Sequence, residues 1–131
     1  MPEDWKSLPA QGLVILGEVE NAQATYDTPS IVVVPLHAGS GMRIKIAEAL
    51  AAGRPIVTTK KGMEGLNLAH RQEVVIADSV DDMAEAIGHL LNHPQEALDM
   101  AARGREWALR HLGHQTQARA WTSFFLQALK A

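Results

Sequence analysis

The stretch IVVVPLHAGSGMRIKIAEALAAGRPIVT, residues 31–58, decides the fold of this chain. It begins and ends with short runs of β-branched residues, at 31–34 and 56–58, which are typical of parallel strands covered on both faces. Between them lie a glycine-containing loop and a segment with helical spacing of apolar residues. This order predicts a strand, a helix and a parallel strand, with the loop at the carboxyl end of the first strand.

The rest of the chain continues the alternation of strands and helices. Residues 13–16 and 74–77 are apolar enough to form further strands, and residues 19–26 predict a short helix that ends before Pro29. Residues 60–68 are predicted to form a loop. The sequence therefore predicts a single Rossmann-like α/β domain, in three α/β/α layers around a mostly parallel sheet.

The last third of the chain is predicted to be helical. Ser79 or Asp81 can cap a helix whose apolar residues recur three and four positions apart. Pro94 begins the next helix and Gly113 ends it. A terminal helix is expected to carry an apolar stripe of Trp121, Phe124, Phe125 and Leu129. Such stripes are usually core or partner surface, and a homodimer contact is one expectation.

The loop at residues 37–43 is the predicted ligand site. A helix that starts just beyond a parallel strand leaves unpaired backbone N–H groups at the strand's carboxyl end, where phosphate binds. His37 lies at the end of the strand and is placed to contact the same ligand. The amides expected to point at the phosphate belong to Gly39, Ser40, Gly41 and Met42.

Two cations in the first turns of the predicted helix support this prediction. The helix dipole disfavours positive charge at Arg43 and Lys45 by roughly a few tenths of a kcal/mol each, and an anion in the loop would remove this conflict. Ile44 extends the apolar sector of the helix, so most of the helix surface is expected to be buried. In the structural alternative, Lys45 pairs with Glu48 and Arg43 bonds to a neighbouring carboxylate.

The turn at residues 60–66 admits two interpretations. It follows a parallel strand, so Gly62 could let the backbone approach a ligand while the two lysines before it attract phosphate, with Glu64 as a further candidate contact. Alternatively, Gly62 and Gly65 only supply positive φ angles. The residues favour neither interpretation over the other.

Two histidines four residues apart, His89 and His93, have a spacing that can hold a metal on one helix face. No glutamate follows His89 directly and no third ligand is obvious, so exposed histidines without a metal are expected.

Composition excludes several function classes. The chain has 131 residues, no cysteine and a formal net charge of −3, so it lacks disulfides, thiolate chemistry and the broad basic surface expected of a nucleic-acid-binding protein. No apolar run approaches the ~20 residues needed to cross a bilayer. A cytoplasmic protein without a membrane span is expected.

Motifs that follow one another in order resemble those of a known family. They are the glycine loop with Arg43 and Lys45, the segment EALAAGRPIV at residues 48–57, and GMEGL at residues 62–66. Together they resemble the C-terminal donor-binding domain of the group 1 (GT4-like) retaining GT-B glycosyltransferases. The resemblance covers most of the chain, beginning at Leu13 and fading in the C-terminal helices.

This resemblance implies that the substrate is a nucleotide diphosphate sugar and that no metal or other cofactor is required. Glu48 matches the second of two family glutamates, which holds the ribose hydroxyls; a carboxylate suits a diol because it accepts two charge-assisted hydrogen bonds. Ser40 stands where the first glutamate would approach the transferred sugar, which leaves contacts with that sugar open. In the branch with Gly-x-Gly-x-Arg-x-Lys, the loop amides and Arg43 would face the diphosphate, with Lys45 as a weaker candidate.

The same resemblance implies that residues 1–131 are part of a larger enzyme. An acceptor domain and the first strands of the donor domain are expected outside the chain, so the chain alone is expected to bind nucleotide sugar weakly and to transfer nothing. A gap in the sheet would be closed by pairing of residues 13–16 with 31–34, or by pairing between two copies. Two other functions stay open: a nucleotide-sugar epimerase of the same fold, and a non-catalytic interaction module.

Overall fold

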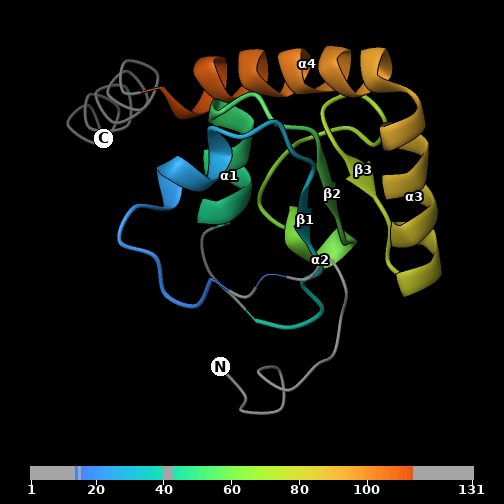
Figure 1. The fold of residues 1–131 in the computed structure, drawn as a ribbon. Coiled ribbons are helices and arrows are strands. Elements are labelled where there is room, and N and C mark those ends of the chain that lie inside the picture. Colours follow the sequence, from blue (N-terminus) through green and yellow to red (C-terminus); the bar gives the residue numbers. More distant parts are fainter. Residues whose placement is uncertain (1–13, 15, 40–42, 114–131) are drawn as a thin grey trace, which may run out of the picture.

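The computed structural model describes residue 14, residues 16–39 and residues 43–113 (Figure 1). Three short strands alternate with helices. In chain order the elements are the 3₁₀ helix η2 (Ala22–Tyr26), β1 (Val32–Val34), α1 (Ile44–Ala51), β2 (Ile56–Thr58), α2 (Lys60–Met63), β3 (Val75–Ile76), α3 (Val80–Asn92) and α4 (Pro94–Leu112).

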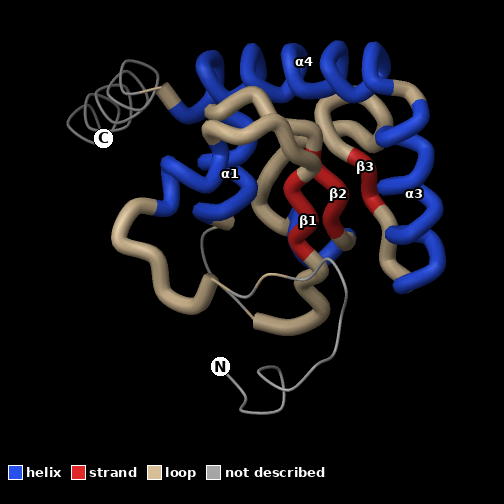
Figure 2. Tube along the Cα trace, viewed as in Figure 1, coloured by secondary structure: helices blue, strands red, loops and turns tan. Residues whose placement is uncertain are grey.

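The strands form one parallel sheet in the order β1-β2-β3 (Figure 2). Val33 of β1 pairs with Val57 of β2, and Val57 in turn pairs with Val75 of β3. The central strand is buried along its whole length, as expected for a parallel strand covered on both faces. The expected parallel strand, helix and strand of residues 31–58 are therefore confirmed.

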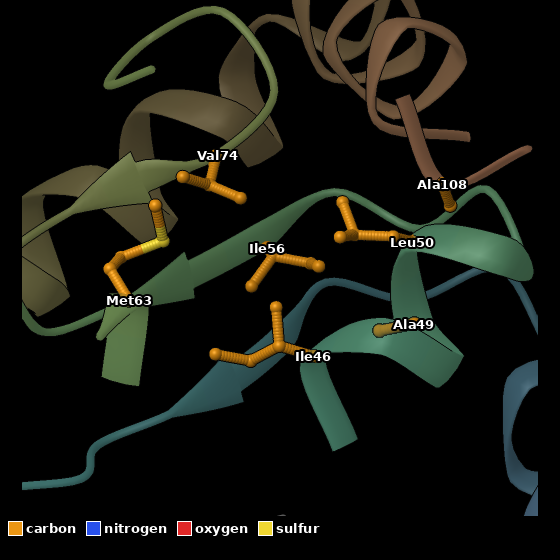
Figure 3. Packing of buried hydrophobic residues seen from close by; sticks show 7 residues of the cluster. All are labelled: Ile46, Ala49, Leu50, Ile56, Met63, Val74 and Ala108. Atoms are coloured by element: carbon orange, nitrogen blue, oxygen red, sulfur yellow. The ribbon is translucent and has the colours of Figure 1, made fainter. Parts of the chain in front are cut away.

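Two hydrophobic clusters cover the two faces of this sheet. Successive side chains of a strand point to opposite faces, and the β2 neighbours Ile56 and Val57 belong to different clusters. The Ile56 cluster includes Leu50 of α1 (Figure 3), and the Val57 cluster includes Met83 of α3. Helix α4 contributes Ala108 to the first cluster, along with Met100 to the second. The predicted α/β/α layering is confirmed.

Helix ends follow the capping residues of the sequence. The Ser79 side chain accepts a hydrogen bond from the Asp82 backbone N–H at 3.0 Å, so Ser79 and not Asp81 caps α3. Helix α4 begins at Pro94 and its C-cap is Gly113, as expected. None of the helices in the described ranges is both long enough and apolar enough to cross a membrane.

Three expectations about local structure are wrong or only partly right. Of residues 13–16, the structure describes Val14 and Leu16, and both are exposed and outside any strand. The helix expected at 19–26 is limited to the five-residue η2. The loop expected at 60–68 contains α2, because the Thr59 side chain caps it by accepting the Gly62 N–H. The predicted terminal helix lies outside the described residues.

Candidate functional site

A cavity lies at the carboxyl end of β1, where the sequence predicts the ligand. Its volume is about 310 Å³. It opens between the end of the strand and the start of α1, the place where parallel α/β sheets bind their ligands. The lining residues are Val34, Leu36, Arg43, Ile44, Lys45 and Ile46.

The loop that leads from β1 into α1 is described only in part. Gly39 has φ +106°, a conformation that strongly favours glycine, whereas Ser40, Gly41 and Met42 lie outside the described residues. The expected amide cradle therefore stays a prediction. Ile44 is 54% exposed at the cavity, so the expectation that it extends the buried sector of α1 is wrong. Ile46, two residues further along the helix, is instead buried in the hydrophobic cluster that contains Leu50.

Arg43 is the most unusual side chain at this cavity. It occupies the N-cap position of α1, and its side chain is only 8% exposed. Its terminal NH2 group lies 3.4 Å from Glu64 Oε2, and its Nε is buried without a hydrogen-bond partner. A buried guanidinium has five N–H donors and is normally paired, so this one has unused capacity for an anion.

Glu64 is a carboxylate next to Arg43, as the structural alternative predicts. A second cation, Lys61, also pairs with it. Lys61 Nζ lies 2.7 and 2.9 Å from the two Glu64 oxygens, closer than Arg43. The Lys61 hydrogen bond, helped by the charges of Lys61 and Arg43, holds the pKa of Glu64 below its usual value. The ionised Glu64 carboxylate therefore interacts mainly with Lys61, and its interaction with Arg43 is weaker.

Glu48 lies on α1 one turn beyond the cavity residue Ile44 and is half-buried. The Tyr26 hydroxyl of η2 donates to Glu48 Oε2 over 3.5 Å. Partial burial, followed by the Glu48 charge and this hydrogen bond, raises the pKa of Tyr26. Glu48 is therefore contacted by an aromatic hydroxyl, and Lys45 lines the cavity with its side chain exposed. Sequence reasoning did not find Tyr26 as a partner of Glu48.

The two glycines of the 60–66 turn, Gly62 and Gly65, are required for different structural reasons. Gly65 has φ +81°, as the structural interpretation expects. Gly62 does not have a positive φ; it is buried in α2, and a Cβ there would lie closer than 3.0 Å to Thr58 Oγ1. The expectation of a positive φ at Gly62 is wrong, because close packing and not backbone conformation requires the glycine.

Polar side chains meet where the three strands end. The Lys60 backbone N–H donates to Asp78 Oδ1 at 2.8 Å, and Lys60 Nζ lies 3.3 Å from Asp78 Oδ2. These contacts, with a smaller effect of the His37 charge, lower the pKa of Asp78. The Thr59 hydroxyl donates to the Leu36 carbonyl and ties this edge to the loop after β1. Asp78 was missed, although it directly follows the last predicted strand.

Acid should weaken this edge. Because the folded pKa of Asp78 is depressed, its contribution to stability is present above its ordinary pKa of 3.8 and is lost as the pH falls through the lower folded value. We expect the urea midpoint of the wild-type chain to fall more steeply below pH 4 than that of Asp78→Asn. Asp99→Asn on α4 is the matched control. Parallel pH profiles for wild type and Asp78→Asn would contradict the expectation.

A second cavity is lined by His89 of α3 and Glu96 of α4. His93, between the two helices, lies beside His89. Their rings stack with centroids 4.2 Å apart, and His89 Nε2 lies 2.8 Å from Glu96 Oε2. This cavity, of about 270 Å³, flanks β3 and also contains Arg71. Within the described part of the chain, no group of three or more His, Asp or Glu side chains is placed to hold a metal.

Comparisons with known proteins identify a family that matches most of the chain. A family described as "Glycosyl transferases group 1" matches residues 2–93, and this match includes the loop, α1 and α2. The chain is 36% identical over 69 residues to a protein named GDP-mannose-dependent alpha-(1-6)-phosphatidylinositol monomannoside mannosyltransferase, in two strains of Mycobacterium tuberculosis, CDC 1551 / Oshkosh and ATCC 25618 / H37Rv.

That alignment covers 51% of this chain and 18% of each mannosyltransferase, so the chain matches about a fifth of the length of these relatives. No solved structure is significantly similar to it. The family match extends over most of the chain and contains the whole candidate site. On these grounds, the chain belongs to the group 1 glycosyltransferases.

Proposed function

We propose that this chain forms the donor-nucleotide site of a glycosyltransferase that moves a sugar from a nucleotide diphosphate sugar to an acceptor, with retention at the anomeric carbon. The chain is proposed to supply only part of the active site and to be inactive alone. Family membership supports sugar transfer, and the cavity at the carboxyl end of β1 supports the location.

The observation that carries the location is the buried Arg43 guanidinium. An under-paired cation beside a cavity and at the start of a helix attracts an anion, and a diphosphate offers several oxygens to the fork of N–H donors. In sugar transfer the nucleoside diphosphate leaves with developing negative charge. Arg43, Lys45 and the loop amides would stabilise that charge.

Glu48 is proposed to bind the ribose of the same nucleotide. It lies on α1 one turn beyond the cavity residue Ile44, so phosphate at the helix start and ribose at its middle follow the order of groups in a nucleotide. Its role is to orient the nucleotide and not to attack the sugar. His37 and Glu64 stay candidate contacts of the donor, whereas Gly62 is buried in α2 and packs against Thr58.

GDP-mannose is the first donor to test, because the mannosyltransferase relatives carry it in their name. Titration of the chain with GDP, UDP and ADP by calorimetry should give saturable binding, with GDP the tightest. Glu48→Ala should weaken GDP binding by about tenfold or more, since hydrogen bonds to a charged group are worth roughly 1.5–3 kcal/mol.

Glu85→Ala on α3 is the matched control, and its affinity for GDP should equal that of the wild type. Saturable binding that is insensitive to Glu48→Ala would remove Glu48 from the site. No binding of any of the three nucleotides would instead favour a non-catalytic interaction module.

A further inference from the structure

We propose that Tyr26 is a positioning residue that orients the Glu48 carboxylate and thereby lets the site distinguish ribose from deoxyribose. This inference rests on the proposed function, because it assumes that Glu48 meets the nucleotide's sugar. It adds a residue from η2, an element outside the loop and helix that form the cavity.

The Tyr26 side chain reaches Glu48 from a separate element. Its ring packs against the hydrophobic cluster of α1 and β2, and its hydroxyl lies 3.5 Å from Glu48 Oε2. A ring held by the core has few alternative positions, so the hydroxyl stays directed at the carboxylate. The Glu48 charge also contributes to the raised pKa of the phenol. The two groups therefore interact electrostatically as well as by position.

Arg54 holds η2 in the position that this contact needs. Its Nε donates to the Tyr26 carbonyl at 2.7 Å, and its NH2 group donates to the Asp27 carbonyl at 3.3 Å. Arg54 itself lies between the end of α1 and the start of β2. The guanidinium thus fixes the end of η2 relative to the helix that carries Glu48.

One hydrogen bond from the phenol leaves the carboxylate free to bind a diol. An ionised carboxylate has about four acceptor positions on its two oxygens, and Tyr26 uses one of them on Oε2. A contact to Oε2 over 3.5 Å restricts rotation of the carboxylate, so the remaining acceptors favour one direction. An oriented carboxylate binds the ribose diol more tightly, because the diol needs two acceptors in a defined geometry. The affinity for deoxyribose, which offers a single hydroxyl, increases less.

The test compares GDP with 2′-deoxy-GDP on the full chain by calorimetry. Wild type is expected to prefer GDP. Tyr26→Phe keeps the ring and removes only the hydroxyl, and should reduce this preference by roughly threefold to tenfold, the range for one hydrogen bond. Glu48→Gln should reduce it further, and Tyr26→Phe should have no additional effect in the Glu48→Gln background. Glu85→Gln is the control and should leave the preference unchanged.

The outcomes separate this inference from the proposed function. If wild type does not bind GDP, or does not distinguish the two nucleotides, the proposed role of Glu48 fails and this inference fails with it. If wild type distinguishes them and Glu48→Gln does not, but Tyr26→Phe keeps the full preference, only the role of Tyr26 is overturned. A Tyr26→Phe chain with a lower melting temperature and an unchanged preference would make Tyr26 purely structural.

Discussion

Replacing Gly62 by alanine should destabilise the chain by about 3–5 kcal/mol, a large part of the 5–15 kcal/mol that typical domains possess. The added Cβ would overlap Thr58 Oγ1, which is fully buried and donates to the Val34 carbonyl at 2.9 Å. Relief requires either rotation of Thr58, which leaves buried polar groups unpaired, or displacement of α2 from β2. The urea midpoint at constant m-value measures the loss.

Two variants test whether the overlap with Thr58 Oγ1 causes the loss of stability in Gly62→Ala. Gly88→Ala makes the same change inside α3, where nothing lies within 4 Å of the new Cβ, and should be neutral or stabilise by up to about 1 kcal/mol. In a Thr58→Ala background the penalty of Gly62→Ala should fall below about 1 kcal/mol, because the nearest remaining atoms lie at 3.5 Å. A Gly62→Ala chain as stable as Gly88→Ala would refute the explanation.

The elements that could be predicted from the sequence are those whose signal is local. The β-branched runs at β1 and β2 and the capping Ser79 each determine a backbone state within a few residues. The sequence did not predict helix α2, because it has only four residues and one of them is a glycine, which disfavours helices. Its stability depends on the Thr59 cap and on burial of Met63 against the α1 side of the sheet.

Only the position of the candidate site could be predicted from the sequence, because it follows from the topology of a parallel sheet. The rule that parallel strands end at one edge located the cavity and Arg43. The partners of the charged groups come from distant sequence positions: Glu64 lies 21 residues from Arg43, and Tyr26 lies 22 residues from Glu48. Spacing on one helix suggested a pair of Lys45 with Glu48. Pairs formed between elements have no periodicity that one sequence reveals.

Arg43→Ala should reduce the affinity for GDP by about 30-fold or more, since removing a buried charge that binds an anion typically costs about 2–5 kcal/mol. Arg43→Lys should fall between Arg43→Ala and the wild type, because it keeps the charge but lacks the planar fork that fits two phosphate oxygens. Arg105→Ala, an exposed position on α4, is the control and should bind like wild type. Calorimetric titration measures all four chains.

Inorganic pyrophosphate separates a phosphate contact from a structural role of Arg43. It should compete with GDP in wild type and in Glu48→Ala, and much more weakly in Arg43→Ala, because Arg43 is the buried cation among the groups assigned to the diphosphate. Glu64→Gln should tighten pyrophosphate binding, since it removes the carboxylate that lies 3.4 Å from Arg43 and competes for it. If Arg43 serves only to pair with Glu64, both substitutions should lower the urea midpoint and leave pyrophosphate binding unchanged.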